Sequence, residues 1–117
     1  MNDFIKAKEL KQLLDSDTPP ILIDVRLSED YEQCHLPTAT NHCVYEMTFV
    51  DRIGDLAPDK QTEIVVYGEH ASSYEGRQAG EKLKRHGYTS VSELRIGIQG
   101  WANEGGPLEG SLPDGET

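Results

Sequence analysis

Residues 64 to 73 read IVVYGEHASS, an apolar run that ends at Gly68 and continues into small and polar residues. A short, continuously apolar run of this kind is typical of a strand that is buried on both faces of a parallel sheet. The segment from about Ser73 to His86 predicts the longest helix of the chain, and Gly87 can adopt the left-handed conformation that commonly ends a helix. A buried strand that leads into a helix favours an α/β domain.

Strands and helices also alternate in the rest of the chain. Two further apolar runs predict buried strands at residues 21–25 and 91–94. Apolar spacing predicts shorter helices at residues 3–15, 29–33, 49–56 and 96–105. We expect Asn2 or Asp3 to cap the first of these helices and Ser28 to cap the second. Since ligands of parallel sheets bind at the carboxyl ends of strands, the loop after residue 67 is a candidate functional site.

Length and composition indicate one globular domain. The chain has 117 residues, of which 36% are hydrophobic and 27% are charged, and these values lie within the globular range. Residues 1–107 are expected to form the domain. Residues 108–117 are rich in Gly, Pro and acidic side chains, and we expect them to form a flexible acidic C-terminal tail.

The charge of the chain argues against polyanionic partners. The 11 Lys and Arg residues are outnumbered by 21 Asp and Glu residues, and a formal net charge of -10 makes us expect neither nucleic acid nor an anionic membrane as partner. No apolar stretch approaches the roughly 20 residues of a membrane helix, and the N-terminus lacks the apolar core of a secretory signal. The two cysteines are compatible with reduced thiols, so we expect a cytoplasmic location.

Five separated segments occur in an order and at a spacing that are similar to those of the rhodanese-like family. They are DVR (24–26), HLPTATN (35–41) preceded by Tyr31 and Glu32, IVVY (64–67), KLKRHGYTSV (82–91) and GIQGW (97–101). The chain resembles this family up to Pro107. The resemblance implies a three-layer α/β fold in which helices flank a mainly parallel sheet of about five strands.

The resemblance also implies a former role for the loop after IVVY. Active members of the family carry a cysteine, which holds a persulfide sulfur, at the position that Gly68 occupies here. Backbone N–H groups at a helix N-terminus stabilise the thiolate and a bound anion in those members. The loop here is about two residues longer, and it lacks the arginine that ends the family loop. We interpret it as a vestigial catalytic loop that consists of Gly68, Glu69, His70, Ala71, Ser72, Ser73, Tyr74 and Glu75.

Two features of this loop argue against anion binding. Glu69 and Glu75 would repel thiosulfate or phosphate from a neighbouring pocket. Ser72 and Glu75 also have the spacing of a capping box, in which two side chains satisfy the backbone N–H groups at a helix start. Asp24 and Arg26, at the end of the strand predicted over 21–25, are expected to support the loops through internal charge-assisted hydrogen bonds.

The serine and histidine residues of the loop raise two other enzyme classes. His70, Ser72 and Ser73 together with Asp24 contain the residue types of a serine hydrolase, but the G-x-S-x-G elbow is absent. The loop also lacks the Gly-Lys-Ser/Thr ending of a nucleotide-binding phosphate loop. We therefore expect neither chemistry.

Cysteine and histidine residues gather in a second segment. Zinc or copper can accept such ligands, which here are Cys34, His35, His42 and Cys43. The spacing argues against a metal site, because adjacent residues point in different directions and ligand pairs usually lie further apart in sequence. The resemblance assigns His35 to a structural position before the proline turn. We expect inert thiols at Cys34 and Cys43 and no bound metal.

The leading hypothesis from the sequence is a rhodanese-like domain that lacks catalytic activity and acts as a binding or regulatory module. We expect a protein partner and no cofactor, and nothing in the sequence identifies a small-molecule ligand. The alternative is a divergent enzyme that transfers sulfur from thiosulfate or a persulfide through Cys34 or Cys43. A third hypothesis is metal storage or sensing by the Cys and His residues of that segment.

Overall fold

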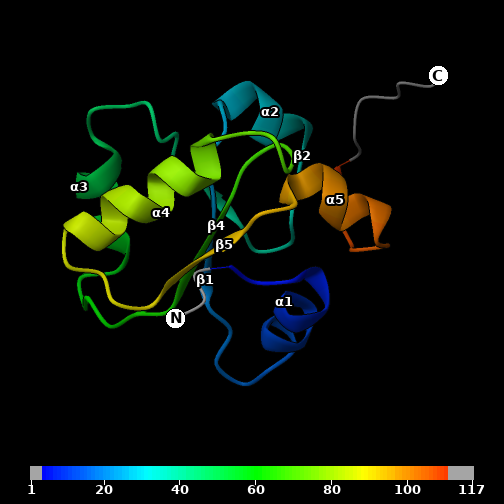
Figure 1. The fold of residues 1–117 in the computed structure, drawn as a ribbon, viewed down its shortest axis with the longest axis horizontal. Helices are drawn as coiled ribbons and strands as arrows, with labels where there is room; N and C mark the ends of the chain where they lie inside the picture. Colours follow the sequence, from blue (N-terminus) through cyan, green and yellow to red (C-terminus); the bar gives the residue numbers. More distant parts are fainter. Residues whose placement is uncertain (1–3, 111–117) are drawn as a thin grey trace.

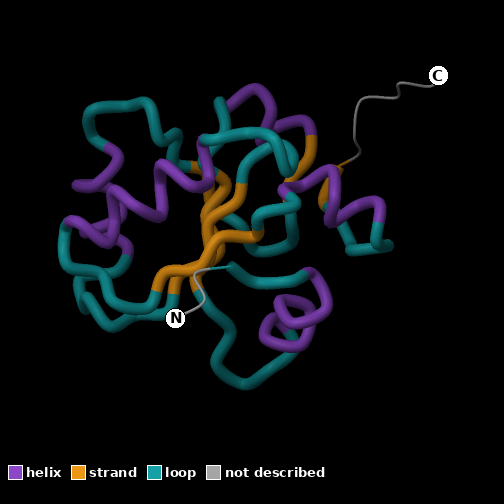
Figure 2. Tube along the Cα trace, viewed as in Figure 1, coloured by secondary structure: helices purple, strands orange, loops and turns teal. Residues whose placement is uncertain are grey.

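The computed structural model describes residues 4–110, and a parallel β-sheet forms its centre (Figure 2). The strands of this sheet follow the order β3-β1-β4-β5. The strands found in the described residues are β1 (Ile21–Asp24), β2 (Cys34–His35), β3 (Thr40–Asn41), β4 (Ile64–Tyr67), β5 (Val91–Leu94) and β6 (Glu109–Gly110). The helices found there are α1 (Ala7–Leu14), α2 (Ser28–Gln33), α3 (Phe49–Leu56), α4 (Glu75–Arg85) and α5 (Gly97–Asn103).

Strands β1, β4 and β5 are in register at their carboxyl ends. Asp24 of β1 lies opposite Tyr67 of β4, and Tyr67 lies opposite Leu94 of β5. All these pairings are parallel, so the loops that follow the three strands leave the sheet at one edge. This edge is where ligands of parallel sheets bind, and it holds the loop after β4.

Helices cover both faces of the sheet and produce the three layers implied by the resemblance. Figure 1 shows α3 and α4 on one side of the strands and α1 and α5 on the other. Strand residues that face α1 and α5 are Leu22, Val65, Tyr67 and Leu94. Strand residues that face α3 and α4 are Ile23, Ile64, Val66 and Val91. The continuous apolar runs are therefore explained by burial on both faces, as the sequence predicted.

Most of the predicted elements are present, with shifts at their ends. The strands at 64–67 and 91–94 and the helix at 49–56 are confirmed residue for residue. Gly87 has φ +96°, which confirms the left-handed turn after α4. Ser28 was predicted to cap α2, but it is the first helical residue, and Leu27 precedes it without a side-chain capping bond.

The first helix is shorter than its apolar spacing predicts. α1 begins at Ala7, and the preceding residues run in an extended conformation along the free edge of β5. Phe4 forms a parallel bridge with Glu93, and the Ile5 N–H donates to the Glu93 carbonyl oxygen at 2.9 Å. The unpaired edge of β5 explains this difference, because it offers backbone partners that a helix would not use. The predicted caps Asn2 and Asp3 lie outside the described residues.

A small antiparallel pair was not predicted. Cys34 and His35 of β2 pair with Gly110 and Glu109 of β6, and the His35 Nε2 lies 3.1 Å from a Glu109 carboxylate oxygen. Residues 108–110 of the predicted tail are thus placed in the structure, whereas 111–117 lie outside the described residues. The domain boundary after residue 107 stays a prediction. Among residues 4–110 no helix has the length and apolar character that crossing a membrane requires.

Candidate functional site

The candidate site is the loop that joins β4 to α4. Its first two residues are anchored to α5, because the Ile98 N–H donates to the Gly68 carbonyl oxygen and the Gln99 N–H donates to the Glu69 carbonyl oxygen, both at 3.0 Å. Gly68 is buried at the carboxyl end of β4. The sequence prediction of a loop at this edge of the sheet is confirmed.

Glu75 fills the space in front of Gly68. A Cβ atom placed on Gly68 would lie 2.6 Å from the Glu75 Cγ, 2.9 Å from its Cδ and 3.2 Å from its Oε2. Glu75 is the first residue of α4, where the helix dipole favours a carboxylate. The side chain of Glu75 therefore occupies the position into which a residue larger than glycine at position 68 would extend.

The middle of the loop satisfies several of its own backbone donors. The His70 N–H donates to the Ser73 Oγ at 3.3 Å, and the Ser72 N–H donates to the His70 Nδ1 at 3.1 Å. The Ser73 N–H donates to the His70 carbonyl oxygen at 2.9 Å. The loop is therefore closed by its own side chains, and the N–H groups of these three residues are not directed at a ligand.

The predicted capping box between Ser72 and Glu75 is wrong. α4 begins two residues later than predicted, its N-cap is Tyr74, and Tyr74 makes no side-chain capping bond. The turn around His70 uses the Ser72 N–H, and Glu75 is a helical residue whose side chain packs against Gly68. The spacing matched a capping box, but a competing local turn delayed the helix start.

Both carboxylate oxygens of Glu69, which the sequence predicted to repel anions, have partners within the protein. One of its carboxylate oxygens lies 3.0 Å from an Arg26 guanidinium nitrogen, and the other accepts a hydrogen bond from the Gln99 side-chain amide at 2.7 Å. Glu69 thus shares the guanidinium of Arg26, a residue 43 positions away in the sequence, with Asp24. Glu75 is the carboxylate that stands at Gly68.

Arg26 is the centre of a buried network that supports this edge of the sheet. Its Nε and Nη2 atoms donate to the two oxygens of Asp24 at 3.0 and 2.7 Å, and Nη2 also donates to the Cys34 carbonyl oxygen at 2.7 Å. Burial alone would lower the pKa of Arg26, but hydrogen bonds and the charge of Asp24, aided by Glu69, raise it overall. The predicted internal bonding of Asp24 and Arg26 is confirmed.

Tyr67 belongs to the same network, and sequence reasoning missed it. Its hydroxyl donates to an Asp24 carboxylate oxygen at 2.9 Å and accepts the Leu36 N–H at 3.1 Å. Burial and the charge of Asp24 raise the pKa of Tyr67, so its hydroxyl stays protonated. A tyrosine at the end of a buried strand was the available signal, because a buried hydroxyl needs a hydrogen-bond partner.

The two thiols are both buried. Cys34 is 1% exposed, and burial raises its pKa although Arg26 lowers it in part. Cys43 is 7% exposed. A protonated and inaccessible thiol is a poor nucleophile, because the thiolate is the reactive species.

The sequence offers four possible metal ligands in one short segment, although their spacing argues against a metal site. Residues 4–110 contain no group of three or more His, Cys, Asp and Glu side chains that could hold a metal ion. The ring of His35 instead stacks on Tyr31, with centroids 4.0 Å apart. Burial lowers the pKa of His42, so it is held as neutral imidazole.

Comparisons with known proteins agree with this fold. A thiosulfate:glutathione sulfurtransferase of Saccharomyces cerevisiae is 26% identical over 109 residues, which are 85% of this chain and 77% of that protein. The solution structure of a rhodanese-like domain from Anabaena sp. has a TM-score of 0.81 at 30% identity and covers 100% of this chain and 89% of that domain. A thiosulfate sulfurtransferase structure from Pseudomonas aeruginosa has a TM-score of 0.79 at 26% identity, over 95% of this chain and 21% of that one.

The family pattern described as Rhodanese-like domain matches residues 6–104, which include every strand of the parallel sheet and the whole loop after β4. The sheet, its covering helices and this match agree over most of the chain. The chain therefore belongs to the rhodanese-like domain family.

Proposed function

We propose that this chain is a rhodanese-like domain without sulfurtransferase activity that serves as a binding or regulatory module. The observation that carries the proposal is the pairing of Gly68 with Glu75. Gly68 has no side chain that could carry sulfur, and the side chain of Glu75 fills the space in front of it. A carboxylate in that space also repels an anionic sulfur donor such as thiosulfate.

The two cysteine thiols of the chain are poorly suited to replace the catalytic cysteine that is missing at position 68. Cys34 is buried and its pKa is raised, and Cys43 is buried as well. Sulfur transfer requires a thiolate that can reach the donor. Both observations support an inert site over a divergent sulfurtransferase that uses either cysteine.

Exposed apolar side chains around this edge of the sheet support a protein partner. Tyr74 in the loop after β4 is 67% exposed, and Leu27 in the connection after β1 is 53% exposed. Both connections follow strands whose carboxyl ends are level. Tyrosine and other large apolar residues often form the centre of protein interfaces, and the Arg26 network holds these loops in place for such a contact.

A sulfurtransferase assay tests the proposal directly. The purified chain would be incubated with thiosulfate and cyanide, and thiocyanate would be measured beside a rhodanese-like enzyme of known activity. We expect thiocyanate at the rate of buffer alone and no added sulfur in the intact mass of the protein. Thiocyanate well above buffer would overturn the proposal, and Cys34→Ser and Cys43→Ser variants would then show which thiol carries the sulfur.

A further inference from the structure

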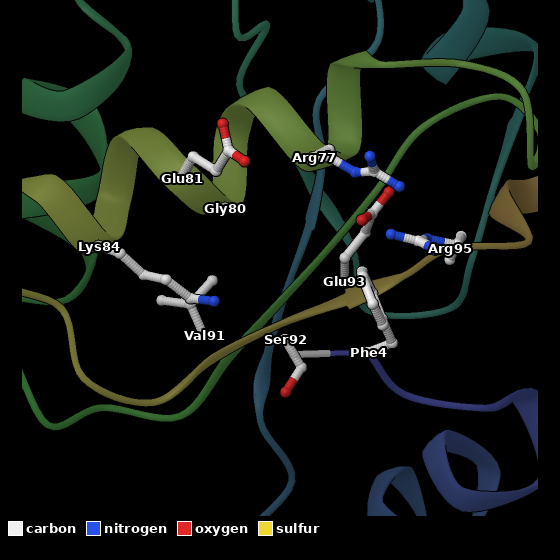
Figure 3. A pocket seen from close by; sticks show the side chains of 9 residues that line it. All are labelled: Phe4, Arg77, Gly80, Glu81, Lys84, Val91, Ser92, Glu93 and Arg95. Carbon is white, nitrogen blue, oxygen red and sulfur yellow. The ribbon is translucent and has the colours of Figure 1, made fainter. Parts of the chain in front are cut away.

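A groove lies between α4, β5 and the extended segment at Phe4. It has a volume of about 220 Å³, and its charged and aromatic lining consists of Phe4, Arg77, Glu81, Lys84, Glu93 and Arg95 (Figure 3). Gly80 and Val91 also line it. Neither Gly68 nor Glu75 contributes to the groove, so it is separate from the candidate site.

One wall of the groove follows from the spacing of residues on α4. The groove-lining residues of α4 share one face of the helix. They lie three, four and seven positions after Arg77 and are Gly80, Glu81 and Lys84. Seven residues of helix correspond to about 10 Å, so Arg77 and Lys84 stand near opposite ends of the groove. Gly80 between them leaves the middle of the wall open.

The charge of the groove is opposite in sign to that of the chain. Three cationic side chains line it against two carboxylates, whereas the whole sequence has a formal net charge of -10. Figure 3 shows the guanidinium groups of Arg77 and Arg95 both extending toward the carboxylate of Glu93. The two guanidinium groups thus converge on one part of the groove, which is the arrangement that a single anionic group can bridge.

The polar groups of the groove are incompletely satisfied within residues 4–110. Glu93 is 7% exposed, and its Oε1 atom makes no hydrogen bond there; the same is true of the Arg95 Nε atom. Buried polar atoms in proteins are normally hydrogen-bonded, so the missing partners of these two atoms mark the groove as a place where a water or an ion can complete the hydrogen bonding. A guanidinium offers five donors in a plane that suits carboxylate and phosphate groups.

The groove also has an apolar surface beside the arginines. The Arg95 guanidinium lies 3.5 Å from the centroid of the Phe4 ring, and the Arg77 guanidinium lies 6.0 Å from it. Phe4 is 38% exposed, so part of its ring is open to a ligand. Val91 and Gly80 extend this apolar surface along the groove.

We propose that this groove binds a small organic anion, whose carboxylate or phosphate group contacts Arg77 and Arg95 and whose apolar part packs against Phe4. The volume is below the range of roughly 300–1,000 Å³ that drug-sized ligands fill, so the ligand is small, of the size of a single substituted ring. This site is independent of sulfur transfer, and the thiocyanate assay does not bear on it.

Nuclear magnetic resonance titration of the ¹⁵N-labelled chain tests the site with three probes of similar shape. Benzoate carries a carboxylate, phenyl phosphate carries a phosphate, and benzylamine carries a positive charge. We expect at least one of the two anions to shift the amide signals of residues 77–84 and 91–95 in a saturable way, and the stronger of the two identifies the preferred head group. Benzylamine is expected to leave these signals unchanged.

Charge-neutral variants separate specific binding from general attraction. Arg77→Gln and Arg95→Gln should each weaken the anion by about tenfold, because a hydrogen bond to a charged group is lost. Arg85→Gln is the matched control, since Arg85 lies on the same helix but lines a different hollow beside Val44 and Tyr45. The amide spectrum of each variant shows whether it is folded.

Several outcomes would overturn the proposal. They are no saturable shift with either anion, equal binding of benzylamine, or an equal loss of affinity in Arg85→Gln and in the two groove variants. If one groove variant fails to fold, the other provides the comparison with Arg85→Gln.

Discussion

Glu75 restricts which side chains position 68 can carry, by its volume as well as by its charge. A Cβ atom on residue 68 would lie 2.6 Å from the Glu75 Cγ. Any residue larger than glycine at this position would therefore require the Glu75 side chain to move. A thiolate placed there would also stand beside a carboxylate, and a neighbouring like charge raises a thiol pKa. Restoring a cysteine therefore addresses only part of what the site lacks.

We predict that Gly68→Cys alone will show little thiosulfate:cyanide activity. Adding Glu75→Arg should raise the rate about tenfold over the single variant, because it replaces the repelling carboxylate with a cation that favours the thiolate. The rate of thiocyanate formation measures both variants. Glu75→Ala with Gly68→Cys separates the relief of crowding from the gain of positive charge.

The control for this series is Gly68→Cys with Glu69→Gln. Since Glu69 is paired with Arg26 and the side chain next to Gly68 is that of Glu75, this change should help much less than a change at position 75. Full activity from Gly68→Cys alone would show that Glu75 does not block the site. An equal gain in rate from substituting either glutamate would show the same.

At the scale of elements, α4 takes part in both the loop and the groove. Its first residue, Glu75, faces Gly68, and its middle residues line the groove beside β5. Gly76 and Gly80 are both buried on the side of the helix that faces the sheet, but their surroundings differ. A Cβ on Gly80 would meet Val91 and Val66 at 3.9 and 4.0 Å, whereas a Cβ on Gly76 would meet the Glu93 Oε2 at 2.9 Å.

We predict opposite effects for alanine at these two positions. Gly80→Ala should raise the free energy of unfolding by about 0.5–1 kcal/mol, because it limits the unfolded backbone and its methyl group fits at ordinary contact distances. Gly76→Ala should lower the free energy of unfolding, because the buried Glu93 carboxylate must move. Urea unfolding measures both, and a shift of the same sign in the two variants would contradict this account of α4.

At the scale of the whole molecule, Glu93 links stability to pH. Burial raises the pKa of Glu93 above its ordinary value of 4.5, although Arg95 and Arg77 lower it in part. Because the folded protein holds this proton more tightly, the unfolded chain ionises first as the pH rises. The stability that Glu93 contributes is thus fully present below about pH 4.5 and is lost as the pH rises through the raised folded pKa.

We predict that Glu93→Gln becomes more stable relative to the natural chain as the pH rises from below 4.5 to neutrality. Glutamine keeps a neutral side chain of similar size, so it avoids the cost of ionising a buried carboxyl group. Urea unfolding of both proteins across this range gives the difference, and the other acidic groups are common to both. A difference that does not change with pH would show that Glu93 ionises equally easily in the folded and unfolded states.

Local sequence was sufficient for the α/β class, because the alternation of buried strands and helices depends on periodicity. The three layers and the missing thiol at Gly68 followed from the resemblance to the rhodanese-like family. The extended segment at Phe4 could not be predicted, because it depends on which edge of the sheet is left unpaired. The separate antiparallel pair of β2 and β6 could not be predicted either, because it joins residues that are far apart in the sequence.

The roles of the two loop glutamates were decided by tertiary structure. Both have the same charge and lie in the same loop region, but Glu69 pairs with Arg26 from the connection after β1, whereas Glu75 faces Gly68. The groove likewise combines α4, β5 and Phe4, which are distant in the sequence. Sequence alone could not separate these cases, because the effect of a charge depends on the groups that the folded chain brings within a few ångströms of it.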